Sequence, residues 1–148
     1  MPTSFKESQT YDNQLEEVFS LKAKAKFKEG ISLLKQMNIK FKSDRKILGL
    51  LGTLFYQLED YNNSSKYFKK ASVVNPNSEL SSLGLFHSYM ELGKIMSALK
   101  EITRFCKVNS PQRYKITIQE LNDNVDNFNK VEKKLILDLQ TFLVKKSK

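Results

Sequence analysis

The sequence has a single cysteine, Cys106, and a single histidine, His87. One cysteine excludes an internal disulfide and any metal site built from several cysteines. A hydrolytic triad requires a nucleophile, a base and an orienting group, and a metal site requires three or four ligands. One cysteine and one histidine supply neither, so the sequence predicts no catalytic, cofactor-binding or metal-binding residues and a protein that is not an enzyme.

Glycine and proline are also scarce, at 5 and 3 of 148 residues. With 40% apolar and 28% charged residues, the composition is that of a single globular domain rather than of a disordered chain. The longest apolar stretch, residues 48–56, is about half the length that crosses a bilayer. The polar N-terminal residues lack the apolar centre of a secretory signal. We therefore expect a cytoplasmic protein that does not enter a membrane.

The net charge of +9 is spread unevenly along the chain. Residues 22–46 carry nine basic side chains against two acidic ones, whereas residues 116–129 carry three acidic side chains and no basic one. A one-sided basic region speeds encounter with acidic partners. Only Arg45, Arg104 and Arg113 are arginines, and the arginine fork is favoured by readers of phosphates and bases. The pattern fits a solvated lysine face or a protein-binding rim, and it disfavours nucleic acid.

A shift of 34 residues aligns the sequence with itself. Residues 45–78 align with 79–112 without gaps, and residues 11–44 fit the same register more weakly. The matched apolar pairs include Leu51 with Leu85, Phe55 with Tyr89, Leu58 with Leu92, and Phe68 with Ile102. Small residues, Gly30, Ser64 and Ala98, share one register position, where two helices cross closely. A unit of this length predicts helix–turn–helix pairs that stack because one pair cannot bury its apolar face alone.

The apolar spacing predicts six helices, at residues 12–25, 28–38, 45–58, 61–74, 79–92 and 95–107. Residues 1–10 are expected to form a frayed tail, and Gly93 suits a left-handed helix end. Gly49, Gly52 and Gly84 lie inside helices, where they permit close packing. A C-terminal amphipathic segment, residues 116–146, has an expected interruption near residues 127–129 and a break in its apolar pattern at Glu132. This segment either caps the last repeat or pairs with a second copy.

Residues 45–112 resemble two tandem tetratricopeptide repeats, and residues 11–44 resemble a degenerate third; together they cover about two thirds of the chain. The resemblance implies an all-α fold, a TPR-like α-solenoid of antiparallel helix pairs in a right-handed superhelix, followed by a C-terminal helix. It also implies a concave groove lined by the first helix of each pair. The groove residues carried over by register are Leu15, Phe19, Lys22, Lys46, Gly49, Thr53, Tyr56, Leu80, Leu83, His87 and Met90.

An apolar groove with a lysine rim predicts a non-enzymatic adaptor or chaperone-like protein. Its partner would be a peptide segment with apolar anchors and some acidic residues. Two alternatives remain open: a bacterial immunity or inhibitor protein that covers a folded toxin, and a chaperone similar to those of type III secretion translocators. Self-association through residues 118–142 is a further alternative.

Overall fold

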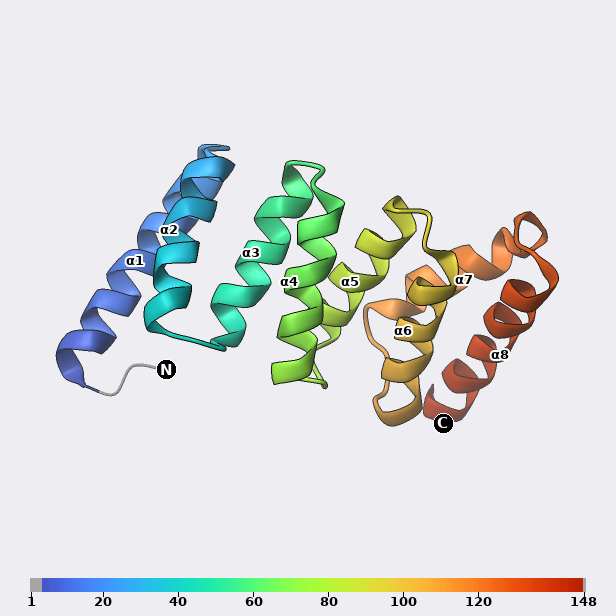
Figure 1. Cartoon of the computed structure of the whole chain (residues 1–148). Helices are drawn as coiled ribbons and strands as arrows, with labels where there is room; N and C mark the ends of the chain where they lie inside the picture. The colour runs from blue at the N-terminus through green and yellow to red at the C-terminus, as the bar shows by residue number, and fades with distance from the viewer. Residues whose placement is uncertain (1–3, 148) are drawn as a thin grey trace. The chain divides into compact units, whose positions relative to one another are not determined.

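The computed structural model describes residues 4–147, which form helices and their connections and contain no strand (Figure 1). The elements are α1 (Phe5–Ala23), α2 (Phe27–Lys40), α3 (Arg45–Gln57), α4 (Tyr61–Val74), α5 (Glu79–Glu91), α6 (Ile95–Val108), α7 (Tyr114–Asp123), the 3₁₀ turn η1 (Val125–Asn127) and α8 (Lys130–Ser147). The all-α expectation is confirmed. Internal contacts group the chain into two compact units, unit 1 (Met1–Asn75) and unit 2 (Pro76–Lys148); the expectation of a single domain stays a prediction.

The first helix begins earlier than expected. Ser4 is the N-cap of α1, and its side-chain oxygen accepts a hydrogen bond from the Glu7 N–H at 3.2 Å. The helix then runs without a break to Tyr11, which is buried. The expectation of a frayed tail over residues 1–10 is therefore wrong from residue 5 onward, because a serine cap and one buried aromatic anchor this end.

The three helix junctions at Ala25, Glu59 and Gly93 have the same backbone geometry at a spacing of 34 residues. Their φ angles are 58°, 60° and 72°, all left-handed. At the first junction the Lys26 N–H donates to the Leu21 carbonyl at 2.8 Å and the Ala25 N–H donates to the Lys22 carbonyl at 3.0 Å. The other two junctions repeat both bonds, which together define a Schellman motif. The left-handed end predicted at Gly93 is confirmed, and two non-glycine residues adopt the same conformation.

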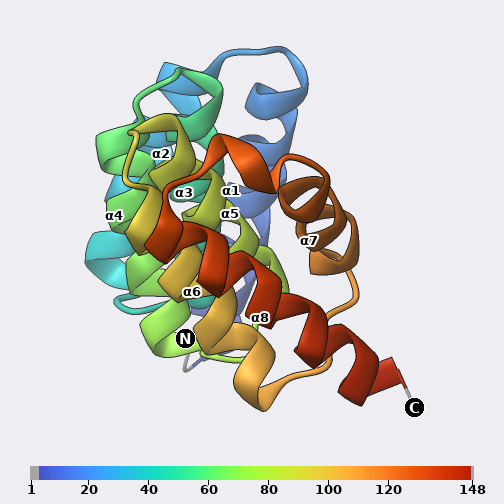
Figure 2. The ribbon, with the colours of Figure 1, turned by 90° about the vertical axis from the view of Figure 1, so that its right-hand side faces the viewer.

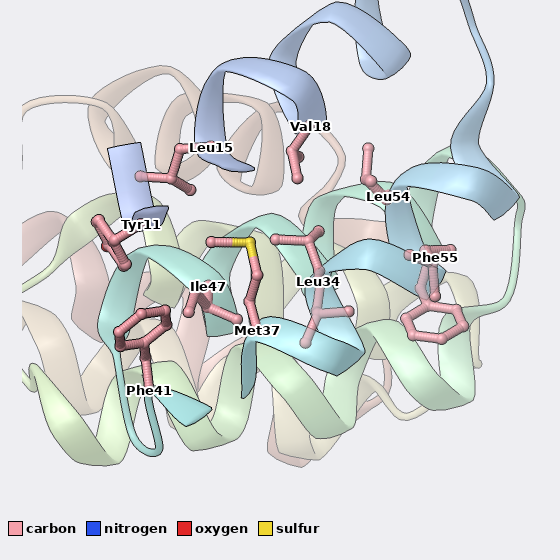
Figure 3. Close-up of a cluster of buried hydrophobic side chains, with 11 residues drawn as sticks. Tyr11, Leu15, Val18, Leu34, Met37, Phe41, Ile47, Leu54 and Phe55 are labelled. Atoms are coloured by element: carbon pink, nitrogen blue, oxygen red, sulfur yellow. The ribbon is translucent and has the colours of Figure 1, made fainter. Parts of the chain in front are cut away.

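Unit 1 is built from helices that each contact the next, from α1 to α4. Its apolar core draws on α1, α2 and α3 (Figure 3). Leu34, Leu51 and Leu54 are fully buried in it. Ser64 of α4 is fully buried as well, as its small size in the repeat register predicts.

Glycines in unit 1 differ in what surrounds them. A Cβ on Gly52 would lie 2.8 Å from the Phe68 ring, and a Cβ on Gly30 would lie 2.8 Å from a Leu54 methyl. These two glycines therefore allow close helix packing. A Cβ on Gly49 would meet nothing within 4 Å, so the packing role predicted for Gly49 is wrong: this glycine faces open space.

A buried hydrogen bond joins α1 to the start of α3 in unit 1. The Tyr11 hydroxyl donates to the Asp44 carboxylate, at 2.9 and 3.0 Å from its two oxygens. The same carboxylate caps α3 by accepting the N–H groups of Lys46 and Ile47 at 2.9 and 3.1 Å. Burial first, and the bond to Asp44 second, raise the pKa of Tyr11. The hydroxyl therefore stays protonated and remains a donor.

Unit 2 is arranged differently, because α8 rather than α7 lies against α6 (Figure 2). The apolar residues Ile118 and Leu121 of α7 and Ile136 and Leu139 of α8 are buried in the same cluster as α6. This burial favours the capping role for the C-terminal segment over pairing with a second copy. The predicted interruption is confirmed, since α7 ends at Asp123 and α8 begins at Lys130.

Glu132, which breaks the apolar pattern, has a local structural role. The Glu132 N–H donates to the Asn129 side-chain oxygen at 2.8 Å, and the Asn129 N–H donates to the Glu132 carboxylate at 2.9 Å. These reciprocal bonds are a capping box at the start of α8. A break in apolar spacing therefore marks the helix start.

A buried polar network joins α5, α6 and α7. Ser82 donates to the Glu101 carboxylate at 2.6 Å, and the Tyr114 hydroxyl lies 2.8 Å from the Ser82 hydroxyl. Arg104 pairs with Glu101, with 2.7 Å between Nη2 and Oε2. The Glu79 carboxylate accepts the N–H groups of residues 112, 113 and 114 at the start of α7. Side chains therefore hold α7 in place.

Candidate protein-binding surface

The predicted groove residues on α1 lie in different environments. Phe19 is 52% exposed and Lys22 is half-buried. Leu15 is only 7% exposed and belongs to the core of unit 1, so its assignment to a binding groove is wrong. Leu15 and Phe19 are only one helical turn apart on α1, and the repeat register alone does not predict which of them is buried.

The predicted groove residues on α3 lie near the surface. Tyr56 is half-buried, and its ring meets that of Tyr61 edge-on, with 5.1 Å between ring centroids. Thr53 is half-buried too, and its hydroxyl donates to the Gly49 carbonyl at 3.0 Å. Lys46 is exposed. Together with open space at Gly49, this face offers one aromatic side chain and one cation to a partner.

The predicted groove residues on α5 are partly covered. Leu83 and Met90 are half-buried against the core of unit 2, whereas Leu80 is 60% exposed. His87 is exposed on one side, and its ring lies 5.3 Å from that of Phe86. Partial burial lowers the pKa of His87, against an opposing effect of Glu120 and Glu91. Leu80 and His87 are therefore the accessible members of this face.

The charge pattern in unit 1 singles out a second surface, on α2 and α4. Residues 30–43 and 61–78 contain no aspartate or glutamate. They carry six exposed lysines, here called the lysine patch: Lys35, Lys40, Lys42, Lys66, Lys69 and Lys70. The charge balance of residues 22–46 does not predict this patch, because half of its lysines lie on α4. The signal is visible in the sequence once α2 and α4 are placed in the 34-residue register.

An aromatic pair lies among these lysines. The rings of Phe55 and Tyr67 stack, with 5.6 Å between centroids and 5° between planes. The Lys35 ammonium lies 5.5 Å from the Phe55 centroid, and those of Lys70 and Lys66 lie 5.2 and 5.8 Å from the Tyr67 centroid. The ring faces attract the cations, so lysines of both α2 and α4 lie against this aromatic pair.

The lysine patch opens into a cavity of about 420 Å³ in unit 1. Its lining residues are Asn38, Lys42, Ser43, Leu48, Lys69, Lys70, Val73 and Val74. We call this cavity the α2/α4 pocket. It combines three ammonium groups with an aliphatic floor and has no carboxylate in its lining.

Unit 2 has a pocket at equivalent repeat positions. Residues 103, 104, 107 and 108 of its lining lie 34 residues after residues 69, 70, 73 and 74 of the α2/α4 pocket. Its remaining lining residues are Lys100 and Leu135 of α8. Arg104 is bound to Glu101 and to the Pro76 carbonyl. The second pocket therefore has fewer cations without a carboxylate partner than the first.

No group of three or more histidine, cysteine, aspartate or glutamate side chains in residues 4–147 is placed to hold a metal ion. None of the helices over these residues is long and apolar enough to cross a bilayer. Cys106 is buried in the core of unit 2.

Comparison with models of known protein families finds no match for this chain, and a search of curated proteins finds no similar sequence. The geometry of the surfaces described above is therefore the basis for a functional proposal.

Proposed function

We propose that this chain is a non-enzymatic protein-interaction module, an adaptor or chaperone-like protein, that binds a segment of a protein partner. In this proposal its helices form a TPR-like α-solenoid of antiparallel pairs. The observation that carries it is the recurrence of one junction geometry at Ala25, Glu59 and Gly93. Equivalent junctions give equivalent helix pairs, and repeated helix pairs present extended binding surfaces.

Exposed apolar side chains on the first helices support the same proposal. Phe19 on α1 and Leu80 on α5 are large apolar residues with more than half of their surface exposed. Aromatic and aliphatic side chains of this kind anchor peptide segments. Lys22 and Lys46 on α1 and α3 would select a segment that also carries acidic residues.

Identification of the partner tests this proposal. The chain would be co-purified from its native cell, and each protein found by mass spectrometry would then be purified and titrated against the wild type and Phe19→Ala. We expect Phe19→Ala to weaken binding of the true partner by about tenfold, or 1.4 kcal/mol, with thermal stability nearly unchanged because Phe19 is exposed. Equal binding by wild type, Phe19→Ala and Leu80→Ser would contradict the proposed surface.

The lysine patch favours a second candidate function, inhibition of a folded acidic protein by electrostatic complementarity. The two functions differ in what the partner must retain. A peptide module binds a short fragment of its partner as well as the intact protein, whereas an inhibitor loses binding when the partner is unfolded. Titration of the partner's fragments and of its folded form separates them.

A further inference from the structure

We propose that the α2/α4 pocket is the docking site for an acidic protein segment that carries an aliphatic side chain. The inference rests on the proposed function, binding of a protein segment, and gives that segment a second acidic contact, on α2 and α4, in addition to Lys22 and Lys46 of the first helices.

The cations of the pocket are not paired with carboxylates. Lys42, Lys69 and Lys70 are exposed, and none of them forms an ion pair with a carboxylate among residues 4–147. The carboxylate nearest in sequence to Lys42 is Asp44, which is 3% exposed. Both of its oxygens are occupied by Tyr11 and by the N–H groups that start α3. Asp44 therefore cannot neutralise the lysines, and they attract carboxylates from outside.

The floor of the pocket accepts an aliphatic group. Val73 and Val74 of α4 line the pocket and are 69% and 43% exposed, and the buried Leu48 lines it as well. Exposed aliphatic side chains that line a cavity gain free energy when an apolar side chain covers them, at roughly 25 cal/mol per Å². The ligand therefore combines carboxylates with an aliphatic residue, which is the chemistry of an acidic peptide.

Nucleic acid fits the same pocket less well. The lining contains no arginine, whose planar fork binds phosphate in two places. Single-stranded nucleic acid is bound by bases that stack on open aromatic rings. Tyr67, the aromatic ring beside Lys70, already stacks on Phe55 and is half-buried. An aliphatic floor without an open ring suits a protein segment.

The experiment is a titration of the ¹⁵N-labelled full chain with a synthetic peptide, Ser-Asp-Glu-Asp-Leu-Asp-Glu-Ser. We expect amide shifts confined to residues 38–48 and 69–74, with affinity that falls as salt rises. The neutral peptide Ser-Asn-Gln-Asn-Leu-Asn-Gln-Ser should bind at least about tenfold more weakly, since its charge attraction is lost. Replacing leucine by serine in the acidic peptide tests the apolar floor in the same way.

Variants of the chain provide the matched controls. The double variant Lys69→Glu/Lys70→Glu should reduce affinity by about tenfold or more, a loss of about 1.4 kcal/mol. Lys6→Glu/Lys28→Glu makes the same change in net charge in the first turns of α1 and α2 and should retain affinity within about threefold. Val73→Ser, at an exposed position, weakens peptide binding without affecting the fold.

Several results would overturn the inference. Shifts confined to residues 15–22 and 46–56 would place the segment on the first helices and leave the proposed function intact. If the amide signals do not shift at peptide concentrations up to about 1 mM, binding is too weak to matter, and the pocket is not a docking site for an acidic segment. Tighter binding of a mixed-sequence oligonucleotide at residues 38–48 and 69–74 would assign the pocket to nucleic acid. The proposed function itself fails only if the purified partner binds Phe19→Ala and Leu80→Ser as well as wild type.

Discussion

The helices of the two units are joined by different buried polar contacts. In unit 1 the Tyr11 hydroxyl bonds to the Asp44 carboxylate, which also caps α3. In unit 2 the Tyr114 hydroxyl reaches Glu101 through Ser82, and Arg104 pairs with that carboxylate. A carboxylate at a helix start is stabilised by backbone N–H groups, whereas one in the middle of a helix needs a cation. The position of the carboxylate therefore decides which partners it requires.

The units also differ in their lysines. In unit 1 no ion pair joins the pocket lysines Lys42, Lys69 and Lys70 to a described carboxylate, while Arg104 in the equivalent pocket of unit 2 is held by Glu101. The same four repeat positions thus give an open basic pocket in one unit and a pocket with a committed arginine in the other. Equivalent repeat positions therefore form a pocket in both units, whereas the charge of each pocket depends on the ion pairs that the neighbouring side chains make.

The largest loss of stability is expected when Glu101 of unit 2 is replaced. Glu101→Ala removes the carboxylate that Arg104 and Ser82 bind directly and that the Tyr114 hydroxyl reaches through Ser82. We expect a loss of about 2–4 kcal/mol in the free energy of unfolding, because the buried hydroxyls lose their acceptor while the remaining Arg104 charge is partly exposed. Urea denaturation followed by circular dichroism measures it. Hydrogen exchange should show the loss in α5–α8 while α1–α4 stay protected.

The exposed residue Glu120 on α7 is the control for this variant. Glu120→Ala should change stability by less than about 0.5 kcal/mol. If Glu101→Ala lowers protection equally in both units, they unfold together as one domain, and the comparison between two independent units is wrong.

A second prediction concerns two glycines of α3 in unit 1. Gly52→Ala places a Cβ 2.8 Å from the Phe68 ring, and we expect a loss of about 1–3 kcal/mol by overpacking. Gly49→Ala meets nothing within 4 Å and should gain about 0.5–1 kcal/mol, because alanine loses less backbone entropy in a helix. Urea denaturation of both variants measures the two signs, and a loss for Gly49→Ala would show that this face is covered.

The junctions provide a third and smaller test. Glu59 has a left-handed φ of 60°, whereas the equivalent junction of unit 2 has Gly93. Relief of backbone strain in Glu59→Gly, about 1–2 kcal/mol, exceeds the entropy gained by the unfolded chain, about 0.4–1 kcal/mol. We expect a net gain of about 0.5 kcal/mol for Glu59→Gly and a similar loss for Gly93→Ala, measured by thermal denaturation. Equal stability of all three proteins would mean that these junctions store no strain.

The smallest expected effect is the pH dependence of unit 2. Partial burial lowers the pKa of His87 in the folded state, so the folded protein binds fewer protons than the unfolded one below the ordinary histidine pKa of about 6.5. Stability of unit 2 therefore falls as pH drops from about 7 through that value, and it is unaffected by His87 above it. Thermal denaturation of wild type and His87→Gln at pH 5 to 8 measures the difference. A pH dependence that persists in His87→Gln comes from other groups.

Much of the helix pattern could be predicted from the sequence. The 34-residue register gave the starts of α3, α4, α5 and α6 without error, because apolar spacing of three and four and the turn at residues 75–78 mark them. The start of α1 was missed because polar residues dominate it, and only the Ser4 cap and the burial of Tyr11 reveal it.

The candidate surfaces were less predictable. Register placed Leu15 and Phe19 on the same groove, yet Leu15 is core and Phe19 is exposed. Helix rotation decides this, and it depends on packing against α2 and α3. The lysine patch was accessible from sequence, whereas the commitment of Asp44 to Tyr11 was not, because those residues are 33 positions apart.

The sequence by itself determined the helices, their 34-residue spacing and the excess of lysine on α2 and α4, because spacing and charge are local properties. Only the tertiary structure decided that Asp44 and Glu101 are buried, that Tyr114 joins α7 to α5 and α6, and that α8 lies against α6. These features depend on contacts between residues distant along the chain, whose free energy no local pattern specifies.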